Sequence, residues 1–172
     1  MAARDRGTLR LRLEGNRYLK LTDCDEPACD GDDTRIHRLV AWWPKQRLYV
    51  VYVGLYEESA AFLVSERDGR ITMLPAPPAL SPSGRQGIAL VSNLMQGVEL
   101  VAIDFSRDRP SVTSITTMPD CGGAGPDSFL RPIPVWTDET HVTFEGQSPL
   151  PDDKSNSKQL LRVVDGKGQW QC

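Results

Sequence analysis

The sequence predicts an all-β fold made of antiparallel strands in blade-like units of about 40 residues. Apolar and polar residues alternate with a period of two in many short segments, as they do in strands with one buried face. We find no window of about 11 residues with the i, i+3, i+4, i+7 apolar pattern of an amphipathic helix. Clusters of Gly, Pro, Asp and Ser separate the segments, and these residues favour tight reversals of the chain.

The first expected element is a hairpin over residues 8–22. Leucines alternate with arginines from Leu9 to Leu13, and Gly15-Asn16 supplies the turn. The same reasoning predicts further strands along the chain, at 39–43, 47–54, 61–65, 71–74, 87–92, 98–103, 111–117, 133–136, 140–145 and 159–164.

Three segments repeat one order of elements: strand, short polar turn, strand, variable loop, strand, turn, strand. They begin at Leu39, Ala79 and Pro134. A four-stranded unit of about 40 residues has the size of a propeller blade. We therefore expect a single all-β domain over 1–172, with blade-like units at about 8–38, 39–78, 79–118 and 133–172. Since a closed propeller has about four to eight blades, an open or partial β-propeller-like arrangement is predicted, with a β-sandwich as the alternative.

Charge and hydropathy narrow the classes of function. The net charge of −3 argues against a nucleic-acid binder, which usually presents a basic face. The longest apolar stretch, Leu48 to Leu55, is much shorter than the ~20 residues that span a bilayer. The amino-terminal segment has no hydrophobic signal core, so we expect either a cytosolic protein or one whose signal peptide has been removed.

The cysteines favour a protein whose signal peptide has been removed over a cytosolic protein. An even number in a small β-rich chain favours disulfides and an oxidising compartment, and hence a periplasmic or secreted protein. Four cysteines allow three pairings; we favour Cys24–Cys29 as a local staple and Cys121–Cys172 as a tie on the chain terminus. Four free thiols are the alternative. The spacing of the cysteines is not that of a zinc ribbon.

No constellation of catalytic residues is visible, so we predict that the protein is not an enzyme. Both histidines, His37 and His141, are expected on strand surfaces. Cys121 has no base nearby in the sequence, and a disulfide explains it better than a nucleophile does. The acidic loop at 23–33 lacks the EF-hand pattern, so no cofactor is expected there. Ca²⁺ binding at this loop, or contact with a basic partner surface, are the alternatives to a solvated loop.

Aromatic side chains are candidates for contact with a partner. Adjacent Trp42 and Trp43 point to opposite faces of a strand, so one of them can be exposed. Tyr56 and Glu57 lie near the tip of the first long hairpin, and we predict that both bind a partner because Tyr is enriched at binding hot spots.

Two resemblances bear on function. The segment from Leu80 to Arg85, LSPSGR, resembles the S-P-D-G-R turn of bacterial propeller repeats, of the kind in the Tol-associated propeller protein. Val98–Asp104 resembles the strand that follows in such blades. More loosely, the chain is similar to small periplasmic immunity proteins that neutralise type VI secreted cell-wall amidases. The similarity lies in length, cysteine use, the 80–85 turn, the Glu99–Asp104 strand and the terminal Cys172.

In the immunity family, the loop between those two strands enters the active site of the effector. The resemblance therefore implies a protein that binds another protein, a secreted peptidoglycan hydrolase, and inhibits it. A propeller-like accessory or scaffold module of the bacterial cell envelope is the alternative. The partner-binding residues that the resemblance implies are Ser92, Asn93, Leu94, Met95, Gln96 and Gly97.

Overall fold

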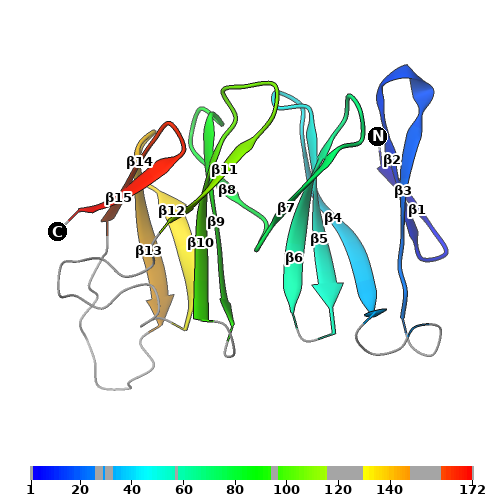
Figure 1. Cartoon of the computed structure of the whole chain (residues 1–172), viewed down its shortest axis with the longest axis horizontal. Helices are drawn as coiled ribbons and strands as arrows, with labels where there is room; N and C mark the ends of the chain where they lie inside the picture. The colour runs from blue at the N-terminus through cyan, green and yellow to red at the C-terminus, as the bar shows by residue number, and fades with distance from the viewer. Residues whose placement is uncertain are drawn as a thin grey trace. The chain divides into compact units, whose positions relative to one another are not determined.

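Antiparallel strands make up almost all the regular structure of the residues that the structure describes (Figure 1). The computed structural model describes residues 2–25, 29, 33–56, 58–93, 97–115, 130–147 and 160–171. Within these residues helical structure is limited to 3₁₀ conformation, at η1 (Glu14–Asn16) and at Asp33, and no helix long and apolar enough to cross a membrane is present. The all-β prediction is confirmed.

The strands of the described residues form four antiparallel sheets, each a simple meander. The first contains β1 (Ala2–Asp5), β2 (Thr8–Arg12) and β3 (Tyr18–Thr22). The second contains β4 (Arg35–Trp43), β5 (Leu48–Leu55), β6 (Ser59–Ser65) and β7 (Ile71–Leu74). The third contains β8 (Ala79–Leu80), β9 (Gln86–Asn93), β10 (Gly97–Asp104) and β11 (Ser111–Ile115). The fourth contains β12 (Leu130–Trp136), β13 (His141–Gln147), β14 (Leu160–Val164) and β15 (Lys167–Gln171).

The chain divides into two compact units, Met1–Pro77 and Pro78–Cys172. The first unit holds the first and second sheets, and the second unit holds the third and fourth. The single-domain expectation stays a prediction.

In the first unit, leucines of the first sheet pack on the second sheet. The arginines that alternate with them on β2 are exposed, as the period of two predicts. Tyr49 is buried in this core, and its hydroxyl donates a hydrogen bond of 2.7 Å to the carbonyl oxygen of Arg12. Burial raises the pKa of this phenol. The buried residues of the cluster are Leu9, Leu11, Leu21, Tyr49, Val51 and Val64.

In the second unit, the third and fourth sheets share one core. Gln86 fastens the two sheets, because its side-chain amide donates to the carbonyl oxygens of Glu139 and Val163 at 3.0 and 3.3 Å. Gly168 lets β15 approach closely, since a Cβ at this position would lie 2.4 Å from Cδ1 of Ile115. The buried cluster is Ile88, Leu90, Leu100, Ala102, Ile115, Val142, Phe144, Leu161 and Val163.

Tryptophans complete the packing of the second unit. The Trp136 indole N–H donates to the carbonyl oxygen of Ala79 at 3.0 Å, which ties β12 to β8. The ring centroids of Trp170 and Phe144 lie 5.5 Å apart. Both tryptophans lie against the shared core.

Strand boundaries differ from the sequence-based expectation mainly where alternation is weak. The strand expected at 39–43 begins at Arg35, so residues 35–38 belong to the second sheet. β1 was not expected. Two parts of expected strands, residues 116–117 and 159, lie outside the described residues.

Candidate functional site

The β9–β10 hairpin carries the first loop that was expected to bind a partner. Pairing of the two strands runs up to Asn93 and Gly97, so Ser92 and both of these residues lie in strands. Leu94, Met95 and Gln96, between them, lie outside the described residues. The chain therefore reverses where the sequence predicted, and the role of this loop in binding stays a prediction.

The β5–β6 hairpin carries the second expected loop. Tyr56 is 60% exposed and Leu55 is 39% exposed. The backbone N–H of Leu55 donates to the carbonyl oxygen of Glu58 at 2.9 Å, which closes the turn. Glu57 lies outside the described residues. An apolar and an aromatic side chain are thus presented on a hydrogen-bonded reversal.

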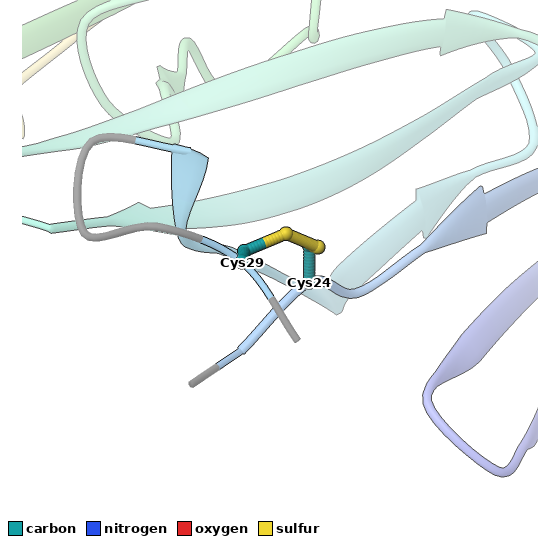
Figure 2. Close-up of a disulfide and its surroundings, with 2 residues drawn as sticks. All are labelled: Cys24 and Cys29. Carbon is teal, nitrogen blue, oxygen red and sulfur yellow. A yellow bond between two sulfur atoms is a disulfide. The ribbon is translucent and has the colours of Figure 1, made fainter. Parts of the chain in front are cut away.

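A disulfide joins Cys24 and Cys29, whose Cα atoms are 5.7 Å apart, as predicted (Figure 2). Cys24 exchanges two backbone hydrogen bonds with Arg35, of 2.9 and 2.8 Å, and Arg35 pairs with Leu55 in the sheet. The disulfide and the Tyr56 turn therefore lie at one end of the first unit. We call Cys24, Cys29, Arg35, Leu55 and Tyr56 together the stapled end. The other two cysteines, at 121 and 172, lie outside the described residues.

His37 is buried, with only 4% of its surface exposed, so the expectation of a strand-surface residue was wrong. Its backbone N–H donates to Asp23 Oδ1 at 2.8 Å, and its Nδ1 lies 3.2 Å from the same oxygen. The imidazole centroid lies 6.1 Å from that of Phe62. A carboxylate partner and an aromatic neighbour make the burial of this ring tolerable.

Both carboxylate oxygens of Asp23 bind groups within the protein. Burial alone raises the pKa of Asp23, but the backbone N–H of His37 and the guanidinium of Arg4, 2.5 Å away, together hold it below its usual value. Arg4 also donates to the carbonyl oxygen of His37. Asp23 therefore ties β1 to β4 and is not presented to an ion.

The remaining acids of the 23–33 loop are only partly described. Glu26, Asp30 and Asp32 lie outside the described residues. Within the described part of the chain, no group of three or more His, Cys, Asp or Glu side chains is placed to hold a metal ion.

His141 lies in a polar cluster at the β12–β13 turn. Asp138 accepts hydrogen bonds from the backbone N–H groups of Thr140 and His141 at 2.7 and 2.9 Å. The Thr140 hydroxyl and Asp138 both meet Nδ1 of His141, at 3.1 and 2.8 Å. In a nucleophile–base–carboxylate relay the nucleophile and the carboxylate meet different ring nitrogens, so this cluster closes a turn and does not have the geometry of such a relay.

A surface pocket of about 340 Å³ lies in the first unit beside Trp42. Residues 12–16 and Glu66 line the rest of it. Trp42 is 50% exposed, whereas Trp43 is only partly exposed, so one member of the pair is on the surface as expected. Sequence reasoning missed the pocket, because its walls come from three segments that are far apart in the sequence. No family model matches the chain, and no match is found among curated proteins or solved structures.

Proposed function

We propose that the chain is a non-enzymatic protein-binding domain of the bacterial cell envelope, and specifically a periplasmic or secreted inhibitor. Its exposed loops cover the active site of a secreted cell-wall-degrading effector. The observation that carries the proposal is the stapled end, where a disulfide and a backbone ladder hold the exposed Tyr56.

The geometry of the stapled end suits recognition because the backbone around Tyr56 is already paired. Arg35 pairs with Cys24 through a single β-bridge and with Leu55 in the β4–β5 ladder. A backbone that is ordered before binding loses less entropy on binding, and preordering raises affinity. Tyrosine supplies a large amphipathic surface with few rotatable bonds, and it is enriched at hot spots.

The scaffold and the compartment are supported by the same structure. Four-stranded antiparallel meanders are the pattern of propeller blades, and three of the four sheets have it. We place these sheets in an open, propeller-like arrangement. The disulfide favours an oxidising compartment, which agrees with a periplasmic or secreted site of action.

The polar clusters support a binding role over a catalytic one. Asp23, His37 and Arg4 join β1 to β4, and Asp138 closes a turn. Each of these groups bonds to another part of the protein, so these two clusters are accounted for without a substrate.

A propeller-like scaffold module of the envelope is the second candidate. The edge strand β12 favours it, because Ile133 is 63% exposed and Val135 is 37% exposed two residues further along. Apolar side chains that alternate along an edge strand suit looser docking to another sheet. Pro134 between them lacks a backbone N–H, which limits pairing at this edge.

The test is a pull-down of the tagged, oxidised protein from the envelope fraction of its source organism, followed by mass spectrometry. We expect one stoichiometric peptidoglycan hydrolase, and we expect Tyr56→Ser to weaken its retention at least ~10-fold, since hot-spot truncations cost about 2 kcal/mol or more. Tyr18→Ser is the matched control, because Tyr18 is 50% exposed in the same unit but lies outside the stapled end. Both variants should melt within a few degrees of the wild type.

The loop at 92–97 is tested in the same experiment with a Leu94→Ser, Met95→Ser double variant. Weaker retention of the same partner would support the loop assignment made from the resemblance. Equal retention by Tyr56→Ser and the wild type would reject the stapled end as the binding surface. Recovery of envelope scaffold proteins in place of an enzyme would favour the second candidate.

A further inference from the structure

We infer that the pocket beside Trp42 is a binding site for a neutral sugar ring, presented as one unit of a glycan. It is formed by residues 12–16, by Trp42 on β4 and by Glu66 after β6. This inference does not rest on the proposed function, because the residues that form the pocket are distinct from those of the stapled end.

Trp42 provides the apolar platform of the site. It is 50% exposed, whereas the neighbouring Leu13 is 7% exposed and fixed below the surface. One face of a sugar ring carries mostly C–H groups, whose hydrogens are slightly positive. The face of an indole ring is electron-rich and attracts positive charge, so the two surfaces are complementary in shape and in charge.

The polar side chains around the platform match a rim of hydroxyl groups. A sugar hydroxyl donates one hydrogen bond and can accept two. Arg12 supplies donors, whereas the carboxylates of Glu14 and Glu66 supply acceptors. Hydrogen bonds to charged partners are about twice as strong as those between neutral groups, so these groups can compete with water for a hydroxyl.

These polar groups are held in position before any ligand arrives. Arg47 bridges the carboxylates of Glu14 and Glu66, and the hydrogen bond with Glu14 raises the pKa of Arg47. The backbone N–H of Glu14 donates to the carbonyl oxygen of Glu66 at 2.9 Å. Arg12 donates to Oδ1 of Asn16 at 2.7 Å. Because the groups are already oriented, a ligand loses less free energy in ordering them.

The carboxylates of the site are already neutralised, which favours a neutral ligand. Arg12, Glu14 and Glu66 line the pocket, and Arg47, which is not part of the lining, pairs with both carboxylates. A cationic side chain would have to displace Arg47 from its two carboxylates. The volume of about 340 Å³ lies at the small end of the range for ligand pockets, about 300 to 1,000 Å³, which suits a compact ligand.

The test is an NMR titration of the whole oxidised chain with three neutral trisaccharides: maltotriose, cellotriose and chitotriose. The Trp42 indole N–H resonance is assigned by its loss in Trp42→Phe. We expect saturable shifts of this resonance and of backbone amides in 12–16 with at least one sugar, and an affinity at least ~10-fold weaker in Trp42→Ala. Trp42→Phe should bind more tightly than Trp42→Ala, because it keeps an aromatic face.

Two controls separate this site from general changes in the protein. Tyr18→Ala removes another half-exposed aromatic side chain of the same unit and should bind the sugar as the wild type does. Tyr56→Ser should also leave the sugar affinity unchanged. The inference is overturned if none of the three sugars gives saturable shifts, or if Trp42→Ala binds as the wild type does. It is equally overturned if N-acetyl-lysine amide binds the pocket more tightly than every sugar.

Discussion

At the scale of single residues, short polar side chains fix the reversals between strands. Asp68 accepts from the backbone N–H of Arg70, Asp104 from that of Ser106, and Asp138 from that of Thr140. Each contact spans two residues, which is the geometry of an Asx-turn. Ser83 makes the same contact with Arg85 at a longer 3.3 Å. Ser83, the second serine of the LSPSGR turn, therefore occupies the place that an aspartate has in the other turns.

The Asp138 turn predicts a specific dependence of stability on pH. The backbone N–H of Thr140, and then the side chain of His141, lower the pKa of Asp138 to about 2 from its usual 3.8. A carboxyl whose pKa is lower in the folded state stabilises the fold fully above the pKa of the unfolded chain, and this stabilisation is lost as the pH falls through the folded pKa. We expect Asp138→Asn to be less stable than the wild type at pH 6, and the difference to shrink as the pH falls from about 4 to about 2.

Urea midpoints of both proteins, measured from pH 2 to pH 6, test this prediction. The two midpoint curves should converge at the acidic end. If they stay parallel over the whole range, the turn does not stabilise the charged form of Asp138.

At the scale of elements, alternation predicted well those strands that bury one face. The 8–22 hairpin is present as β2 and β3, and the apolar run at 47–54 is present, shifted by one residue, as β5. β1 escaped prediction because its sequence, AARD, has no alternation. It forms because the turn at Arg6 and Gly7, both with positive φ, returns the chain to pair with β2.

The candidate sites also divide into those that the sequence predicted and those that it did not. Hairpin tips and the local disulfide were predictable, because each depends on residues close together in the sequence. His37 was not, since the partners that make its burial tolerable are Asp23 and Phe62, far from it along the chain. The Trp42 pocket likewise depends on long-range packing and leaves no spacing signal in the sequence.

The disulfide predicts how the stapled end responds to mutation. Cys24 and Cys29 are five residues apart, and closing a loop of this size restricts the unfolded chain by about 2 kcal/mol in the chain-entropy account. We expect the Cys24→Ser, Cys29→Ser double variant to lose about that much unfolding free energy. The variant is preferable to a reductant, because a reductant acts on every cysteine of the chain.

Hydrogen exchange locates the effect within the first unit. The amides of Cys24, Arg35 and Leu55 are hydrogen-bonded at the stapled end, so they should exchange faster in the double variant. Amides of Leu9 and Leu11, in the buried part of β2, serve as the internal control. Unchanged exchange at Arg35 would show that the strand pairing holds this end without the disulfide.

At the scale of the whole molecule, the two compact units each have a buried cluster of their own. Leu11 belongs to the cluster of Met1–Pro77 and Leu161 to that of Pro78–Cys172, and neither has exposed surface. Since each cluster is closed within two sheets, local opening of one unit need not open the other. The length of the chain, in contrast, favours a single domain that unfolds as a whole. The two expectations differ in whether a substitution in one unit destabilises the other.

We expect Leu11→Ala and Leu161→Ala each to destabilise one unit by about 2–5 kcal/mol, the usual cost of emptying a fully buried leucine site. Hydrogen exchange followed by mass spectrometry can distinguish the units. Leu11→Ala should accelerate exchange in β2 to β6 and leave β9 to β14 unchanged, and Leu161→Ala should do the reverse. If either substitution accelerates exchange equally in all four sheets, the chain unfolds as one cooperative domain. In that case the stapled end and the Trp42 pocket draw their rigidity from the whole chain and not from the first unit alone.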